Sequence, residues 1–302
     1  MIDEKQPFVS VVVPTFNRGQ ALCQALKSLL KQDYKNYEIL VVDQSTKKFA
    51  IKEKFLKKYK AKLRLFRLNP PSLTAARNLG VKKAKGKIIL FCDDDIVAGE
   101  GLVSAHAINY KDESVGAVTG RVITVGQKME VDCRSAGQIS PWGTVAGGFS
   151  SQIRQEVKNV FGCNLSWRRK VLKEAGGFDE NFVGNALREE TDMALRVSRL
   201  GWRIVFDPKA ELSHLRAPTG GCRKSEGRLK WYHDFFHNET YFFLKHLNWF
   251  WWPIFWFTRW QYFLRSMFGF GREVSLRSLS TPWQGIVDGI KTYRRWQNEN
   301  RC

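Results

Sequence analysis

KIILFCDDD, residues 87–95, is the segment from which the fold of this chain can be inferred. Its apolar part, residues 88–92, has the short, β-prone composition of a strand that is buried in a sheet. The three aspartates that follow lie at the carboxyl end of this strand, where open α/β sheets bind their ligands. Adjacent carboxylates repel one another unless a cation neutralises them, and hard divalent ions prefer oxygen ligands. The segment therefore predicts a metal site at a sheet edge; a solvated acidic turn is the alternative.

The regions on both sides alternate between strand and helix patterns. We expect strands at 8–13, 37–42, 62–67 and 87–92, with helices at 19–31, 47–60 and 73–84 between them. This alternation predicts a parallel sheet with βαβ crossovers. After the aspartates the sequence predicts a strand at 115–125, a mobile polar loop over a site at 126–157, helices at 168–175 and 190–200, and a last strand at 203–206.

Composition limits the classes of protein that fit. The chain has 302 residues and is 43% hydrophobic, which suits one large domain or a domain with an extension. Its six cysteines form no Cys-x-x-Cys pair, so we expect neither a zinc site nor a disulfide framework, and a reducing cytosol. The first residues lack the pattern of a signal peptide. No phosphate-binding Gly-x-x-x-x-Gly-Lys loop and no Gly-x-Gly-x-x-Gly after the first strand is present, which argues against P-loop ATPases and dinucleotide oxidoreductases.

The net charge of +20 is concentrated in two blocks. Residues 47–87 carry fifteen Lys and Arg against Glu53 alone, and residues 221–302 carry thirteen against six acidic residues. Basic blocks of this kind suit an anionic membrane surface or a nucleic acid, or they keep the protein soluble.

Aromatic residues are dense between positions 231 and 270. The run WFWWPIFWF at 249–257 has nine residues, whereas a membrane-spanning helix needs about 20 apolar ones. Tryptophan together with Arg259 and Arg265 suits the headgroup zone of a bilayer, so we expect an interfacial or re-entrant segment. A dimer interface or a helical hairpin packed in the core is the alternative.

Five short motifs occur in a fixed order. They are VVVPTFNR at 11–18, Asp43 at the end of the second strand, AARN at 75–78, DDD at 93–95, and GGFDE at 176–180 followed by EETD at 189–192 and LR at 195–196. Together they resemble a family 2 glycosyltransferase with the GT-A fold over about residues 8–216. The resemblance implies an α/β fold with a Rossmann-like, mostly parallel central sheet. It predicts a catalytic domain at 1–220 and a basic, Trp-rich helical extension at 221–302.

The same resemblance implies a nucleotide-sugar site. Its expected members are Pro14, Thr15, Asn17, Arg18, Asp43, Arg77, Asn78, Asp93 and Asp94. Asp43 corresponds to the residue that hydrogen-bonds uracil, and Asp93 is expected at the ribose. Arg77 can pair with a carboxylate or a phosphate through its planar fork. A surface cation within the basic block is its alternative role.

A metal site is implied at the same place. Asp95 is expected to hold Mn²⁺ or Mg²⁺ together with Asp93 and His214, and the ion would stabilise the departing diphosphate. Imidazole can complete a carboxylate site, although a lone histidine after the last strand can also be purely structural.

The general base is expected among three acids, in the order Glu190, Asp192, Glu189. The family has Glu-Asp where this chain has Glu189-Glu190, so the assignment stays open among them. A partly buried carboxylate accepts a proton more readily, whereas acids in the first turn of a helix can also serve only to stabilise it. The expected chemistry is a single in-line displacement with inversion.

The predicted function is transfer of one sugar by a hexosyltransferase. The Gln-x-x-Arg-Trp motif of processive synthases is absent, since the nearest string, WFTRW at 256–260, lacks the glutamine. We expect a UDP-sugar donor and a lipid-linked or cell-surface-glycan acceptor, as in polysaccharide or cell-wall biosynthesis. The enzyme is expected to be cytoplasmic and peripheral on the inner face of the membrane. Gly220, Gly221, Arg223 and Lys224 are candidates for a flap over the diphosphate.

Three alternatives remain. One is a GDP- or dTDP-sugar donor, and another is an inactive transferase-like scaffold. The third is a basic protein that binds nucleic acid by stacking bases on aromatic side chains. No nucleic-acid partner is expected, because the lysines of the 47–60 helix are not interleaved with exposed aromatics.

Overall fold

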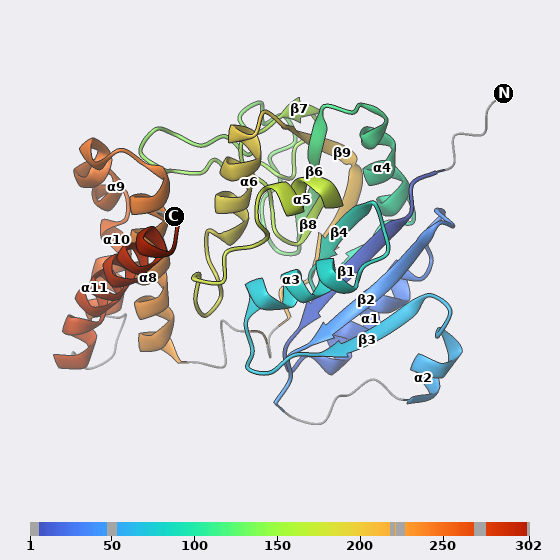
Figure 1. Ribbon diagram of the computed structural model, residues 1–302, viewed down its shortest axis with the longest axis horizontal. Coiled ribbons are helices and arrows are strands. Elements are labelled where there is room, and N and C mark those ends of the chain that lie inside the picture. Colours follow the sequence, from blue (N-terminus) through green and yellow to red (C-terminus); the bar gives the residue numbers. More distant parts are fainter. Residues whose placement is uncertain (1–5, 47–52, 218–220, 222–226, 269–275, 301–302) are drawn as a thin grey trace.

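The computed structural model describes residues 6–46, 53–217, 221, 227–268 and 276–300. In this part of the chain the core is a nine-stranded sheet in the order β3-β2-β1-β4-β8-β6-β9-β5, with β7 paired to β9 beside this path (Figure 1). Helices cover both faces of the sheet, and a group of helices from the C-terminal part packs at one end. The α/β class with a mostly parallel central sheet is confirmed.

The first half of the sheet follows the predicted βαβ pattern. Its elements are β1 (Val9–Thr15), α1 (Gly19–Leu29), β2 (Tyr37–Asp43), α2 (Glu53–Lys58), β3 (Leu63–Arg67), α3 (Leu73–Lys83) and β4 (Ile88–Cys92). The pairs β1–β2, β1–β4 and β2–β3 are all parallel. Every residue of β1 is buried, because helices cover both of its faces.

Close packing fixes α3 against β1. Ser72 caps the helix by accepting a hydrogen bond from the backbone N–H of Ala75. A Cβ at Gly80 would lie 2.4 Å from Cγ1 of Val12, so only glycine lets the helix come this close to the strand. The predicted helix at 47–60 is described only as Glu53–Lys58, and residues 47–52 lie outside the described part.

The second half of the sheet contains both parallel and antiparallel pairs, in keeping with a sheet that is mostly and not entirely parallel. Its elements are β5 (Ile96–Ala98), α4 (Leu102–Ile108), η1 (Asn109–Lys111), β6 (Val115–Thr124), β7 (Gln155–Glu156), β8 (Asn164–Arg168), α5 (Arg169–Glu174), α6 (Glu189–Arg199) and β9 (Arg203–His214). Strand β8 is antiparallel to β4 and β6, and β5 is antiparallel to β9. Sequence patterns missed β5 and β8 because both are short. Strand β5 comes soon after β4, and β8 runs directly into α5.

The last strand is longer than predicted. It runs to His214 and does not stop at Phe206, because a bulge accommodates residues 208–210: Gly120 pairs with Asp207 and the next residue, Arg121, pairs with Glu211. His214 therefore lies at the end of β9 and not in a segment after it.

The C-terminal helices pack on the part of the chain that forms the sheet. They are α8 (Arg228–His246), η2 (Trp249–Trp251), α9 (Trp252–Phe257), α10 (Trp260–Phe268) and α11 (Leu276–Glu299). Tyr241 and Phe242 of α8 share a buried apolar cluster with Phe182 and Ala186, which precede α6. None of the described helices combines the length and the apolarity needed to cross a bilayer.

Candidate active site

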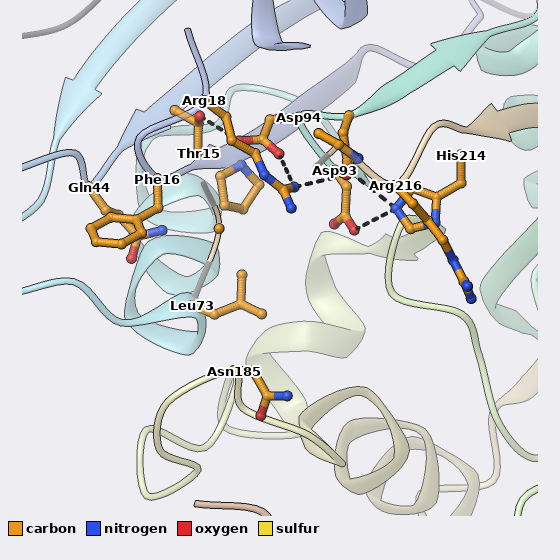
Figure 2. A pocket seen from close by; sticks show the side chains of 14 residues that line it. Thr15, Phe16, Arg18, Gln44, Leu73, Asp93, Asp94, Asn185, His214 and Arg216 are labelled. Carbon is orange, nitrogen blue, oxygen red and sulfur yellow. Dashed lines mark hydrogen bonds and ion pairs between the residues drawn. The ribbon is translucent and has the colours of Figure 1, made fainter. Parts of the chain in front are cut away.

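A cavity of about 430 Å³, here called the first cavity, opens at the carboxyl ends of β1, β2 and β4. Its lining consists of Pro14, Thr15, Phe16, Arg18, Gln44, Leu73, Asp93, Asp94, Asp95, Asn185, His214, Arg216, Ala217 and Gly221. Figure 2 shows Asp93, Asp94 and His214 on one side and Asn185 on the other. Parallel strands that end at one edge bring these polar residues together.

The predicted metal residues form one cluster. Ligand atoms of Asp93, Asp95 and His214 all lie within 4.8 Å of one another. Nε2 of His214 is 3.2 Å from Oδ1 of Asp95 and 4.0 Å from Oδ2 of Asp93. Pairing of Ile96 with His214 between β5 and β9 sets this approach. Two carboxylates and an imidazole fit a divalent ion such as Mn²⁺ or Mg²⁺.

Arg18 supplies the nearest positive charge. Its Nη1 lies 2.9 Å from Oδ1 of Asp94 and 3.0 Å from Oδ2 of Asp95. Burial raises the pKa of Asp94 to about 6, although Arg18 and the hydroxyl of Thr15, 2.6 Å away, oppose the change. Burial also acts on Asp95, but the hydrogen bond from His214 and the charge of Arg18 outweigh it and lower that pKa.

Asn17 and Asp43 lie next to the first cavity rather than in its lining. The backbone N–H of Asn17 donates to Oγ of Ser45 at 2.8 Å, and the backbone N–H of Ser45 donates to Oδ1 of Asp43 at 2.9 Å. Asp43 is fully buried at the end of β2 and forms an ion pair with Arg67. These contacts hold the loops after β1 and β2 together beside the cavity.

Arg77 and Asn78 lie deeper in the protein. Arg77 is only 2% exposed, so its alternative role as a surface cation is wrong. It forms an ion pair with Glu189 and donates to the carbonyl of Gly162 at 3.1 Å. Asn78 donates to the carbonyl of Phe178 at 2.9 Å and accepts from its N–H at 2.8 Å, which fixes the turn that precedes α6. Neither residue belongs to the lining of the first cavity, and their contact with a nucleoside stays a prediction.

The three candidate bases have different surroundings. Glu189 is buried against Arg77. Asp192 is fully buried and lies 2.7 Å from His246, 2.7 Å from Lys245 and 2.5 Å from Arg196. Burial would raise the pKa of Asp192, but the His246 hydrogen bond and the charges of Arg196 and Lys245 hold it far below its usual range.

Glu190 is half-buried and lines a different cavity of about 560 Å³, here called the second cavity. The segment 185–190 contributes to both cavities, because Asn185 lines the first, while Leu187, Arg188 and Glu190 line the second. Glu190 thus faces a cavity whose lining is linked to the site of the aspartates through one short segment.

Sequence reasoning missed several lining residues. Gln44, Asn185 and Arg216 line the first cavity, and the C-terminal helices supply part of the second. No motif marks them, because they come together only through packing of distant segments.

The expected flap is described only in part. Gly220, Arg223 and Lys224 lie outside the described residues, whereas Gly221 lines the first cavity and donates its N–H to the carbonyl of Phe16 at 2.9 Å.

Comparisons with known proteins agree with this arrangement. The family model described as "Glycosyl transferase family 2" matches residues 10–175. An uncharacterised glycosyltransferase of Rickettsia bellii is 40% identical over 209 residues, which cover 69% of this chain and 28% of that protein. A probable glycosyltransferase of Bacillus subtilis, YdaM, is 28% identical over 215 residues, 68% of this chain and 50% of that one. This chain therefore spans half the length of these relatives or less.

Solved structures share the fold. GalNAc-T7, solved with UDP, GalNAc and Mn²⁺, superposes with a TM-score of 0.60 at 18% identity, covering 80% of this chain and 50% of that one. The mannosyltransferase PcManGT of Pyrobaculum calidifontis, solved with GDP-Man and Mn²⁺, superposes with a TM-score of 0.54 at 15% identity, covering 98% of this chain and 76% of that one.

Proposed function

The chain belongs to glycosyltransferase family 2, and from this premise we propose that it is a metal-dependent, inverting enzyme that transfers one sugar from a UDP-sugar to a lipid-linked or cell-surface glycan. The observation that carries the proposal is the cluster of Asp93, Asp95 and His214 in the first cavity. Two structural neighbours were solved with a nucleotide or nucleotide-sugar and Mn²⁺, which supports a donor site of this kind.

The donor end of the reaction is assigned to the first cavity. Asp93, Asp95 and His214 would hold Mn²⁺ or Mg²⁺, which supplies positive charge for a diphosphate leaving group. Arg18 lies against the same carboxylates and can pair with phosphate oxygens through its planar guanidinium. Pro14 and Thr15 line the cavity at the end of β1, with Asn17 and Asp43 beside it to contact the nucleoside.

Glu190 is the base that the geometry favours. Glu189 is engaged by Arg77 and Asp192 by three cationic or imidazole groups, whereas Glu190 lies at a cavity wall. Its carboxylate accepts the proton of the acceptor hydroxyl while the hydroxyl oxygen attacks the anomeric carbon. The bond from that carbon to the diphosphate oxygen breaks, and its electron pair leaves with the nucleotide. Attack opposite the leaving group inverts the configuration.

Peripheral contact with the inner face of the membrane is part of the proposal. Large apolar side chains are exposed on the C-terminal helices: Trp249 is 81% exposed, Phe257 74%, Phe250 64% and Trp283 60%. We call these four residues the aromatic patch. Tryptophan favours the bilayer interface, and each basic residue near an anionic surface contributes about 1 kcal/mol.

Two other readings remain as outcomes of the test. GDP or dTDP as the donor nucleotide would keep the mechanism and change only the base contact near Asp43. A scaffold without activity would bind no nucleotide at all. The intact acidic cluster and the placement of Glu190 favour the enzyme.

Calorimetric titration with UDP, GDP and dTDP, each with and without Mn²⁺, tests the proposal. Binding of UDP that requires Mn²⁺ is expected. Metal-dependent binding of GDP or dTDP in its place would correct the donor, and no binding of any of the three would remove the enzymatic proposal.

A further inference from the structure

We propose that the second cavity binds the acceptor as a neutral sugar ring, and that the C-terminal helices complete this acceptor site. The inference rests on the proposed function, because it takes Glu190 as the base. It adds the place of the acceptor, its chemical class and a role in the active site for the extension.

The position of the second cavity suits an acceptor. Glu190 lines it, and segment 185–190 contributes residues to both cavities. The guanidinium of Arg77 lies 5.4 Å from the ring centroid of Phe91, two residues before Asp93, and a Cβ at Gly162 would lie 2.9 Å from Nη2 of Arg77 and 3.7 Å from Oε1 of Glu190. A hydroxyl held beside Glu190 would therefore be near the donor cluster without occupying the donor cavity.

The walls of the second cavity suit a sugar ring. They contain the aromatic side chains of Trp142, Phe149, Phe161, Phe235 and Tyr262. Phe149 and Phe161 are stacked, with ring centroids 5.4 Å apart and planes 8° from parallel. Small-ligand sites commonly combine such apolar walls with a few placed polar groups, and flat aromatic faces match the C–H faces of a sugar.

One buried polar residue in the lining of the second cavity has an oxygen without a hydrogen-bond partner in the part of the chain that the structure describes. Asn159 is only 4% exposed, and its Oδ1 has no hydrogen-bond partner among the described residues. Buried polar atoms are nearly always paired in folded proteins, so an unpaired one at a cavity wall indicates a ligand that donates a hydrogen bond. A sugar hydroxyl does this.

The charges of the second cavity favour a neutral ligand. Nε of Arg188 lies 2.7 Å and Nε of Arg259 2.5 Å from the carboxylate of Glu239, which is buried between them. The two arginines are balanced by Glu239 and Glu190, so these four lining residues carry no net charge. A uronic acid or a phosphorylated sugar would find no excess cation among them and would be repelled by Glu190, whereas a neutral sugar is not repelled.

The C-terminal helices form much of the wall. Phe235 and Glu239 come from α8, Thr258 and Arg259 come from the segment that joins α9 to α10, and Gln261 and Tyr262 come from the start of α10. Nη2 of Arg259 donates to the carbonyl of Gly143 at 3.0 Å, which ties the 142–149 part of the loop to this segment. The extension is therefore needed to close the site.

Fluorine NMR of protein labelled with 5-fluorotryptophan tests the inference. The Trp142 resonance is assigned by its loss in W142F, and the probes are p-nitrophenyl β-glycosides of glucose, galactose, N-acetylglucosamine and glucuronic acid. At least one neutral glycoside is expected to shift the Trp142 resonance, and the glucuronide is expected to leave it in place. Trp167, buried in the sheet, and Trp283, in the aromatic patch, should not respond.

Variants locate the binding. Tyr262→Ala and Asn159→Ala are expected to weaken glycoside binding by about fivefold or more, the size of one lost hydrogen bond or ring contact. Gln261→Trp, at an exposed position, should block the second cavity without removing any core side chain. Trp260→Ala is the matched control, because Trp260 adjoins Gln261 in sequence, is 55% exposed and is not part of the lining.

The outcomes separate the two proposals. A Trp142 resonance that no neutral glycoside moves, or a shift that survives in both Tyr262→Ala and Gln261→Trp, overturns the acceptor site. UDP with Mn²⁺ is titrated into the same samples. Glycoside binding without nucleotide binding would leave a sugar site and remove the transferase mechanism. Nucleotide binding without glycoside binding would keep the donor site and overturn the acceptor site.

Discussion

The acids at the start of α6 differ in what surrounds them. Glu189 faces Arg77 inside the protein, Asp192 lies among Arg196, Lys245 and His246, and Glu190 lies at the wall of the second cavity. Neighbours in sequence therefore have different chemistry, because successive helical residues point to different sides. Substitutions at these positions should affect different properties of the enzyme.

Glu190→Gln is expected to lower the turnover of sugar transfer by about 10²- to 10⁴-fold, the usual effect of removing a general base. Nucleotide binding and thermal stability should stay near wild type, because the carboxylate lies at a cavity wall. Steady-state kinetics and a melting curve measure both.

Glu189→Gln is the matched comparison. It leaves the buried Arg77 without its carboxylate and should cost about 3–5 kcal/mol of unfolding free energy. Full activity in Glu190→Gln would contradict the assignment of the base.

Asp95→Asn is expected to abolish the metal-dependent part of UDP binding. The carboxylate lies in the cluster with Asp93 and His214, and an amide is a much weaker ligand for a hard cation. Calorimetry with and without Mn²⁺ measures this. Asp112→Asn, at an exposed acid away from the first cavity, serves as the control. Unchanged metal-dependent binding in Asp95→Asn would refute the metal site.

His106 makes stability depend on pH. It is fully buried between Ser166 and Asn164, each 2.8 Å from a ring nitrogen, and burial lowers its pKa to about 4. The unfolded chain binds this proton near pH 6.5, so stability is complete above that value and falls as the pH drops from 6.5 to 4. The loss attributable to this group is about 3 kcal/mol at about 1.36 kcal/mol for each unit of pKa difference.

Urea unfolding at several pH values between pH 4 and pH 7 measures how the free energy of unfolding changes with pH. His106→Gln removes the titrating ring and should give a flatter dependence than wild type over this interval. Parallel curves for the two proteins would show that His106 does not contribute.

Helix α8 is joined to α6 by buried charges as well as by apolar contacts. Nζ of Lys245 lies 2.5 Å from Oδ2 of Asp179 and 2.7 Å from Oδ1 of Asp192, and its side chain is only 5% exposed. The turn before α6 and α6 itself thus share one ammonium group on α8. This connection places the C-terminal helices in a fixed position beside the base.

Lys245→Met is expected to lower the unfolding free energy by about 3–5 kcal/mol, because it removes the ammonium group that the largely buried Asp179 and the fully buried Asp192 share, and among the described residues only Asp192 keeps another cation, Arg196. Lys291→Met is the control: its side chain is 70% exposed and pairs with Asp288 on the surface of α11, so it should change stability by less than about 1 kcal/mol. Chemical denaturation measures both. Equal stability of the two variants would show that the buried cluster does not hold α8 in place.

At the scale of the whole molecule, the C-terminal helices pack at one end of the sheet (Figure 1). They contribute residues to the second cavity and carry the aromatic patch. Removing residues 221–302 would expose the buried cluster around Phe182 and Tyr241, so truncation is expected to damage the catalytic part as well. Surface substitutions are the cleaner test of membrane contact.

Replacing Trp249, Phe250 and Phe257 by serine is expected to abolish co-sedimentation with liposomes that contain anionic lipid. The wild-type protein should bind them, more weakly as salt rises, because basic residues add a screened attraction. A triple serine variant at Ile108, Val125 and Leu200, which are exposed outside the C-terminal helices, is the control. Retained binding in the first variant would assign membrane contact to the basic block at 47–87 or remove it.

Local patterns in the sequence were enough to predict the first half of the sheet and the acidic cluster at the ends of its strands. Strands β1, β2 and β4 are apolar runs that end in or are followed by polar residues, and helix α1 between the first two shows regular apolar spacing. Such signals depend only on neighbours along the chain, so they can be read without knowing the packing. The position of Asp93–Asp95 at a sheet edge followed from them.

The remaining features of the fold and of the site depend on packing between distant segments. The antiparallel strand β8, the extension of β9 to His214, the pairing of Arg77 with Glu189 across 112 positions, and the second cavity all depend on contacts far apart in sequence. Glu189 and Glu190 are the same residue type in one turn of helix, and only their surroundings distinguish an ion-pair partner from a candidate base. The cause is that burial and the nearest charges, which set what a carboxylate can do, are properties of the folded chain.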